Sequence, residues 1–186
     1  MNLFFYSDPH FGHGNVIKYC NRPYDSVHKM NEDLIKRYNS RVGVDDICIW
    51  LGDSFICNID RAKDIMSRLN GKKILIRGNH DPSVTRCYRI GFDFVCEDMT
   101  MKIAGKYVKL HHFPYKIPWW KTIFKKYDMR RNKYRLKNQG KWLVHGHVHN
   151  SWGKINKNQI NISCDVWDRY PVNKSTIEKI IQRGRL

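Results

Sequence analysis

The sequence lacks any pairing pattern of cysteines, because its six cysteines are scattered and none forms a CxxC motif. Disulfide frameworks and thiolate zinc sites usually show regular cysteine spacing. Cys48 lies within the apolar run ICIWL, where a small buried hydrophobic residue is the ordinary interpretation. We therefore expect free thiols in a reducing compartment.

Long apolar runs are also missing. No stretch reaches the roughly 18 consecutive apolar residues that indicate a transmembrane helix. The opening MNLFFYSD has no basic region ahead of its short apolar stretch, so a signal peptide is not indicated either. We expect a cytoplasmic protein without membrane association.

Acidic residues are scarce relative to basic ones. Asp and Glu number 17 against 34 Lys and Arg, which gives a formal net charge of +17. Such an excess is frequent in proteins that bind polyanions, but it also fits a solvated basic surface. The composition leaves both interpretations open.

The chain is long enough for one domain with a sizeable core, since 41% of its 186 residues are hydrophobic. Apolar runs typical of strands occur at 3–7, 47–51, 73–77, 106–110, 141–145 and 160–166. Helical patterns occur at 29–39, at 60–70 with Gly71 as C-cap, and from a Ser175–Glu178 capping box to about 183. This alternation predicts an α/β fold, with residues 1–186 forming a single domain.

Residues that can bind metals follow five of these strands. In chain order they are Asp8 and His10, then Asp53, then Asn79, His80 and Asp81, then His111 and His112, and finally His147 and His149. Ligands bind at the carboxyl edge of strands in α/β sheets, so we expect these side chains to meet. Carboxylate, imidazole and amide oxygen suit Mn, Fe, Zn, Ni or Co better than calcium. Asp53 is the natural bridging ligand between two metals, because no other candidate follows ICIWLG.

The ordered series Asp-x-His, Gly-Asp, Gly-Asn-His-Asp, His, Gly-His-x-His resembles that of the calcineurin-like metallophosphoesterases. The stretches SDPHFGHGNVIKYCNRP and NISCDVWDRYPV are more narrowly similar to a group of small bacterial and phage phosphoesterases. The resemblance implies a four-layer fold, a sandwich of two mixed β-sheets flanked by helices. It also implies two divalent transition-metal ions, most often Mn, at the sheet edge.

The resemblance carries a ligand set onto this chain. One metal would be held by Asp8, His10, Asp53 and His149, and the other by Asp53, Asn79, His112 and His147. His112 is favoured over His111 because similar proteins have the ligand directly before an aromatic-Pro pair.

Two metals lower the pKa of a bridging water and neutralise phosphoryl oxygens, which predicts hydrolysis of a phosphomonoester or phosphodiester by metal-activated hydroxide attack. His80 is expected to face the substrate phosphate and to protonate the leaving oxygen, with Asp81 orienting it. The alternative is a non-catalytic nucleic-acid- or protein-binding scaffold. Relatives of that sort usually lose ligands, and none is missing here.

A basic and aromatic insertion at about 113–141 separates two of the motifs. Its residues 116–141 hold ten Lys and Arg and one acid, with Trp119, Trp120, Phe124, Tyr127 and Tyr134 interleaved. This composition suits a phosphate backbone with base stacking, and so a nucleotide or nucleic-acid substrate. It equally suits an amphipathic helix whose aromatics anchor to the core while its charges are solvated.

Several further residues have assigned expectations. Candidate substrate-binding residues are His13, Arg22, Lys125, Lys126, Arg130 and Arg131, although a surface position is the simpler interpretation of Arg22. His145 has the opposite strand parity to the ligands and is expected to be structural. Asp165 and Trp167 are expected to be packing and turn residues of the last strand.

Overall fold

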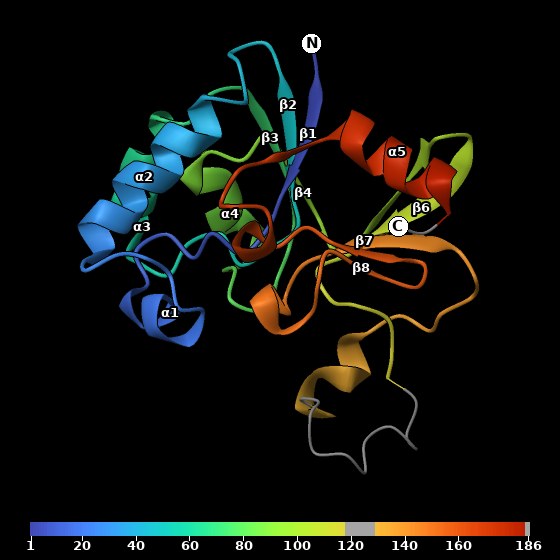
Figure 1. The fold of residues 1–186 in the computed structure, drawn as a ribbon. Coiled ribbons are helices and arrows are strands. Elements are labelled where there is room, and N and C mark those ends of the chain that lie inside the picture. Colours follow the sequence, from blue (N-terminus) through green and yellow to red (C-terminus); the bar gives the residue numbers. More distant parts are fainter. Residues whose placement is uncertain (118–128, 185–186) are drawn as a thin grey trace.

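The computed structural model describes residues 1–117 and 129–184, and it contains two mixed five-stranded sheets (Figure 1). The first sheet has the order β10 (Val172–Asn173), β1 (Leu3–Tyr6), β2 (Ile47–Trp50), β3 (Lys72–Ile76) and β4 (Phe94–Cys96). The second has the order β5 (Met99–Ile103), β6 (Lys106–Leu110), β7 (Trp142–His145), β9 (Gln159–Asn161) and β8 (Ile155–Asn156). Strands β1 to β4 run parallel, as do β6, β7 and β9, while β10, β5 and β8 are antiparallel to their neighbours. The expected two-sheet α/β architecture is confirmed.

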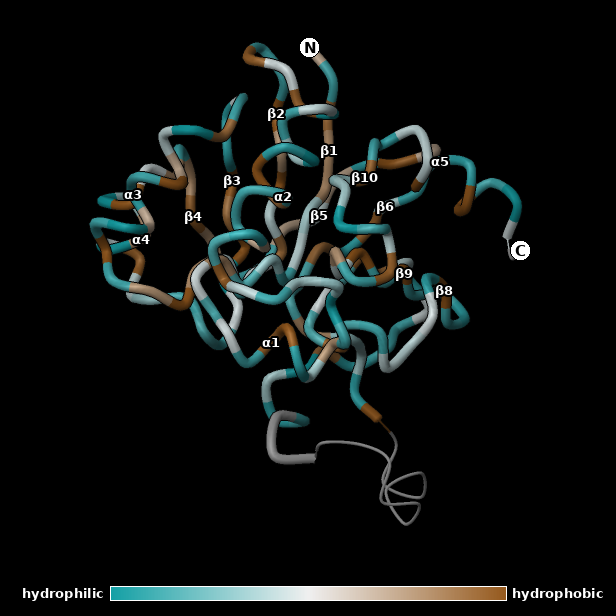
Figure 2. Tube along the Cα trace, turned by 60° about the vertical axis from the view of Figure 1, so that its left-hand side comes forward, coloured by the Kyte–Doolittle hydropathy of each residue, from teal (hydrophilic) through white to brown (hydrophobic). Residues whose placement is uncertain are grey.

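Successive side chains of a strand point to opposite faces of the sheet. Both faces of the first sheet are buried, which explains why it needs runs that are apolar at every position. Phe4 and Tyr6 face a core cluster shared with the helices, whereas Phe5 faces a second cluster shared with the other sheet. Trp50 and Leu51 divide in the same way at the end of β2. A sheet covered on both faces is typical of parallel strands, and several of its strand segments are brown in Figure 2.

The helices cover this sheet mostly from one side. Helices α1 (Gly14–Tyr19), α2 (Val27–Asn39), α3 (Ile59–Ser67) and α4 (Val84–Ile90) pack against its outer face (blue to green in Figure 1). Helix α5 (Lys174–Arg183) contributes Ile177 and Ile180 to the cluster between the sheets. On the second sheet's outer side, the amide of Tyr115 donates to Gln159 of β9 and the Trp152 ring packs against His145 of β7. Within the described residues, loop segments cover this part of the outer face of the second sheet.

Two helix caps differ from the expectations. Helix α3 ends at Ser67, so Gly71 is not its C-cap; Gly71 has φ +74° in the following turn, where a Cβ would lie 2.6 Å from the Asp46 carbonyl oxygen. Helix α5 begins at Lys174, and the side chain of its N-cap Asn173 accepts a hydrogen bond from the Ser175 amide over 2.8 Å. The predicted capping box at Ser175–Glu178 is therefore wrong, because the Asn two residues before Ser175 already caps the helix.

The last predicted strand is shorter than its apolar run. Strand β9 ends at Asn161, and a short 3-10 helix, η4 (Cys164–Val166), follows it. The six cysteines are all free, as expected. Among the described helices, none has the length and apolar character needed to cross a membrane.

Candidate metal centre

The carboxyl ends of β1, β2, β3, β6 and β7 meet at one edge of the sandwich. The loops there are joined by backbone hydrogen bonds: the Asp8 amide donates to the Gly52 carbonyl over 3.1 Å, and the His10 amide donates to that of Asp53 over 3.2 Å. In the second sheet, the Gly146 amide donates to the His112 carbonyl over 3.0 Å. Five predicted motifs, far apart in sequence, therefore form one continuous surface.

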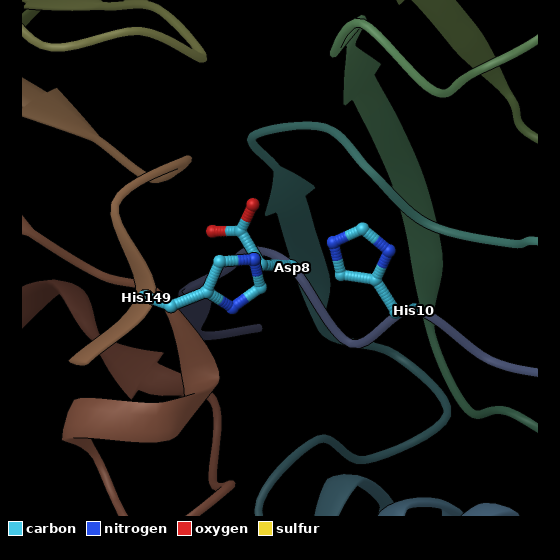
Figure 3. A group of neighbouring side chains, drawn as sticks. All are labelled: Asp8, His10 and His149. Carbon is cyan, nitrogen blue, oxygen red and sulfur yellow. The ribbon is translucent and has the colours of Figure 1, made fainter. Parts of the chain in front are cut away.

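The first group of candidate ligands consists of Asp8, His10 and His149, whose ligating atoms lie within 4.8 Å of one another (Figure 3). Oxygen Oδ2 of Asp8 accepts hydrogen bonds from Ser7 Oγ over 2.8 Å and from the His147 amide over 2.9 Å. Oxygen Oδ1 of Asp8 and Nε2 of His10 are buried without a hydrogen-bond partner among the described residues. Buried polar atoms are normally paired, so these two donor atoms fit a metal ion.

The second group consists of Asp53, His112 and His147, with Asn79 beside it. Nε2 of His112 lies 3.5 Å from Oδ2 of Asp53 and 3.2 Å from Oδ1 of Asn79. Nδ1 of His112 lies 2.7 Å from the Leu51 carbonyl oxygen. A carbonyl only accepts, so Nδ1 carries the proton and Nε2 faces the group.

His111 does not join this group. Its Nδ1 lies 3.1 Å from the carbonyl oxygen and 3.2 Å from the amide nitrogen of Phe113, so it faces the backbone of its own loop. Of the two neighbouring histidines, His112 is thus the one that the structure directs at Asp53.

Asp53 lies between the two groups. Its Oδ2 is 3.7 Å from Nε2 of His10 in one group and 3.5 Å from Nε2 of His112 in the other. Its Oδ1 accepts a hydrogen bond from the His80 amide over 2.8 Å. Oδ2 of Asp53 therefore lies close to an imidazole of each group, where it could contact ions held by either one.

Burial and mutual contact shift the pKa values of these groups in opposite directions. Burial raises the pKa of Asp53, but His112 and His10 lower it well below its ordinary range. Burial lowers the pKa of His112, but the Asp53 carboxylate raises it to about 9. For His10 burial prevails and lowers the pKa to about 3, so its ring is a neutral ligand. The Asp53 carboxylate is therefore held ionised, whereas burial raises the pKa of Asp8 above its ordinary value.

The backbone of this site is strained at five of the candidate ligands. Non-glycine residues rarely adopt positive φ, and such strain concentrates at functional sites. The five are Asp8 (56°), His10 (50°), Asp53 (54°), His147 (70°) and His149 (46°).

Glycines precede the ligands because the loops approach one another closely. A Cβ on Gly146 would overlap Ser7 Oγ and Asp8 Oδ2, and a Cβ on Gly52 would lie 2.5 Å from Nδ1 of His112. Only glycine leaves the room for these contacts, which accounts for the Gly-Asp and Gly-His pairs of the motifs.

The structure corrects the expected role of Asp81. Its Oδ2 accepts hydrogen bonds from the amides of Asp53 and Gly78, over 2.8 and 2.7 Å, and its Oδ1 accepts from Ser54 over 2.9 Å. Both carboxylate oxygens are thus used to join the loops after β2 and β3. Asp81 therefore fixes the backbone that carries Asp53, and among the described contacts none joins it to the His80 ring.

A cavity of about 390 Å³ opens onto the candidate ligands. Its lining includes the imidazoles of His10, His147 and His149 together with Asp53 and His80. Apolar and aromatic residues such as Val16, Tyr19 and Trp152 also line it.

Two further residues that can carry positive charge line this cavity. His13 lines it, with its ring centroid 5.6 Å from that of His10. The sequence did not indicate Arg135, a buried residue that also lines the cavity and lies at the returning end of the basic insertion.

Arg22 and Asp165 are also placed differently from the expectations. Arg22 is 4% exposed and forms an ion pair with Asp165, so it is neither a surface residue nor a contact for substrate in the cavity. Asp165 is not a simple turn residue, because its Oδ2 lies 2.7 Å from Nδ1 of His149. The only signal in the sequence was the motif NISCDVWDRYPV, which includes this acid.

The remaining candidates fall into two classes. His145 is fully buried and Nδ1 lies 2.8 Å from the Gly146 carbonyl oxygen, which agrees with a structural role. Lys125 and Lys126 lie outside the described residues, as do the side chains of Arg130 and Arg131.

A family model described as calcineurin-like phosphoesterase matches residues 1–181. An uncharacterized protein of Methanocaldococcus jannaschii is 32% identical over 192 residues, covering 99% of this chain and 93% of the relative. The Gene 66 protein of Mycobacterium phage L5 is 30% identical over 190 residues, covering 90% and 88%. The crystal structure of a protein of unknown function from Aquifex aeolicus shares the fold, with a TM-score of 0.69, 23% identity, and coverage of 96% and 98%.

Proposed function

Because the chain belongs to the calcineurin-like phosphoesterase family, we propose that it is a dinuclear metal-dependent phosphoesterase acting on a nucleotide or nucleic-acid phosphate. The observation that carries the proposal is the position of Asp53 Oδ2, within 3.7 Å of His10 on one side and 3.5 Å of His112 on the other. In this proposal one ion is held by Asp8, His10, Asp53 and His149, and the other by Asp53, Asn79, His112 and His147. The donors are nitrogen and oxygen only, which suits Mn and also Fe, Zn, Ni or Co.

The chemistry that two such ions supply when bound is a lowered pKa for water and neutralised charge on phosphoryl oxygens. The chain itself must supply a proton to the leaving oxygen. His80 is the candidate for this step, since its exposed side chain lines the cavity and its amide is fixed to the Asp53 carboxylate. An imidazole at this position can protonate an alkoxide as the phosphorus–oxygen bond breaks.

The shape of the cavity supports a substrate larger than inorganic phosphate. A volume of about 390 Å³ lies within the range of small-molecule sites, and the aromatic residues Tyr19 and Trp152 line the same cavity as the proposed ligands. Aromatic side chains in such a lining suit a nucleobase or another flat apolar ester group. The scaffold alternative has less support, because every position of the proposed ligand set is filled.

The test is metal content followed by a substrate panel. We expect about two Mn equivalents per chain, and hydrolysis that a chelator abolishes. The panel compares aryl phosphate monoesters and diesters, cyclic nucleotides, and single-stranded oligonucleotides. Two bound equivalents without hydrolysis of any substrate would favour the scaffold, whereas failure to bind Mn or Zn would overturn the metal site itself.

A further inference from the structure

A buried ion pair lies directly behind the first group of candidate ligands. The side chains of Arg22 and Asp165 are 0% and 3% exposed, with Nε to Oδ1 at 2.7 Å and Nη2 to Oδ2 at 3.0 Å. Removing two charges from water is costly, and it is tolerated when the remaining donors and acceptors are well used. What else the pair contacts therefore indicates what it does.

On one side the pair holds a candidate ligand. Oδ2 of Asp165 lies 2.7 Å from Nδ1 of His149. An ionised carboxylate only accepts hydrogen bonds, so Nδ1 of His149 must carry a proton and its Nε2 is the atom left for a metal. Carboxylates that fix ligating histidines in this way raise the affinity for the metal.

On the other side the pair holds the loop that carries Asp8 and His10. Nη2 of Arg22 donates to the Asp8 carbonyl over 2.8 Å, and Nη1 donates to the Pro9 carbonyl over 2.7 Å. The thiol of Cys164, next to Asp165, also donates to the Asp8 carbonyl over 3.3 Å. Asp8 and His10 have φ of 56° and 50°, so this backbone is strained and needs such external support.

We propose that Arg22 and Asp165 are positioning residues that fix His149, Asp8 and His10 together as the ligands of one metal ion. This inference rests on the proposed function. The two residues act through the ligands, because neither is among the residues that line the cavity. Only arginine has donors enough to serve a carboxylate with Nε and Nη2 and two carbonyls with Nη2 and Nη1.

The variant Asp165→Asn tests the arrangement with minimal change of shape. An amide has one acceptor oxygen, so it cannot serve both Arg22 and His149, and its NH₂ group must oppose one of them. We expect the affinity for one of the two Mn equivalents to fall roughly 10–100-fold, with the other unchanged. Asp168→Asn is the matched control, since Asp168 is exposed and lies three positions further along the chain.

A second measurement does not depend on metal. In the metal-free protein, the His149 ring proton on Nδ1 should give a downfield proton resonance that exchanges slowly with solvent. In Asp165→Asn this resonance should disappear, or its proton should exchange rapidly with solvent, whereas in Asp168→Asn the resonance should remain. The variant Arg22→Lys keeps the charge but loses the fork of donors, so it should also weaken one Mn equivalent selectively.

The outcomes separate this inference from the proposed function. Selective loss of one Mn equivalent together with loss of the ring-proton resonance supports the pair as a positioning device. Equal weakening of both equivalents alongside a lowered melting temperature would mean that the pair is merely structural, and it would overturn the inference. So would two equivalents bound with unchanged affinity. If wild type binds no Mn, the proposed function and the metal-positioning role fail together, and a surviving ring-proton resonance would leave the pair only a structural role.

Discussion

The carboxylate of Asp8 accepts a hydrogen bond from the backbone amide of His147 over 2.9 Å, across 139 residues of sequence. Asp8 follows β1 in the first sheet and His147 follows β7 in the second, so this contact joins the two sheets at the site. Each proposed metal ion would take ligands from both sheets. The geometry of the site therefore depends on how the sandwich is packed.

Gly146→Ala tests this dependence. The added Cβ would overlap Ser7 Oγ and Asp8 Oδ2, so the loop must move away and the contact between Asp8 and His147 must lengthen. We expect the free energy of unfolding of the metal-free protein to fall by about 1–3 kcal/mol, the usual range for overpacking. Urea denaturation measures this change, and Mn affinity should fall as well.

Gly153→Ala is the control for that substitution, because a Cβ there would have no heavy atom within 4 Å. Its unfolding free energy and Mn affinity should remain near the wild-type values. Equal behaviour of the two variants would show that the close approach at Gly146 is not needed for the site.

Asp53→Asn tests the proposed bridge. Replacing the shared carboxylate by an amide removes negative charge from both ligand groups, so we expect the occupancy of both ions to fall and turnover to be nearly lost. Metal content after desalting and the rate of phosphate ester hydrolysis measure the two effects. Asp168→Asn should retain both properties. An Asp53→Asn protein with two full equivalents and intact turnover would exclude the bridging role.

His80→Ala separates proton donation from metal binding. The His80 side chain is not part of either ligand group, so two metal equivalents should remain bound. The rate should fall roughly 10²–10⁴-fold for esters with poor leaving groups and much less for those with good ones, which need little protonation. His28→Ala, at an exposed position of α2, is the control. A loss that is independent of leaving-group pKa would leave His80 only a role in positioning phosphate.

The sequence predicted which polar residues meet at the sheet edge, but it predicted the short elements of the fold less well. The runs LFFYS and ICIWL predicted β1 and β2 because a sheet buried on both faces requires apolar residues at every position. Strands β8 and β10 have only two residues each, and α1 has six, so none of them is long enough to show a hydrophobic period. Their formation depends on neighbours that are distant in sequence.

The parts of the site that could not be predicted depend on contacts across the fold. Arg22 and Asp165 are 143 positions apart, and in the sequence a buried arginine looks the same as an exposed one. The family resemblance implied that Asp81 orients His80. In the structure its carboxylate instead binds three backbone amides of the neighbouring loops, a role that composition and spacing do not reveal.

The basic insertion is the last feature with a testable consequence, because its ends are joined beside the cavity. The Lys116 amide donates to the Leu136 carbonyl over 2.8 Å, and the Ile117 amide donates to Oδ1 of Asn132 over 3.1 Å. Arg135, next to this junction, lines the cavity. The intervening chain therefore leaves and returns beside this cavity, and we expect its Lys and Arg residues to bind a polyanionic substrate.

Replacing Lys125, Lys126, Arg130 and Arg131 by Ser should flatten the salt dependence of oligonucleotide binding. Neutralised phosphates release counterions, so the logarithm of affinity falls with the logarithm of salt concentration by about 0.7 per phosphate contacted on a single strand. The KM for oligonucleotides should rise, while hydrolysis of a small aryl phosphate should hardly change because the proposed ligands and His80 remain. The charge-matched control replaces Lys72, Lys102, Lys106 and Lys179, which are exposed and do not line the cavity. Lys72 and Lys106 begin β3 and β6, at the end of the sheets opposite to the site. If both quadruple variants keep the wild-type salt slope, the insertion is a solvated basic surface and a small nucleotide is the better substrate.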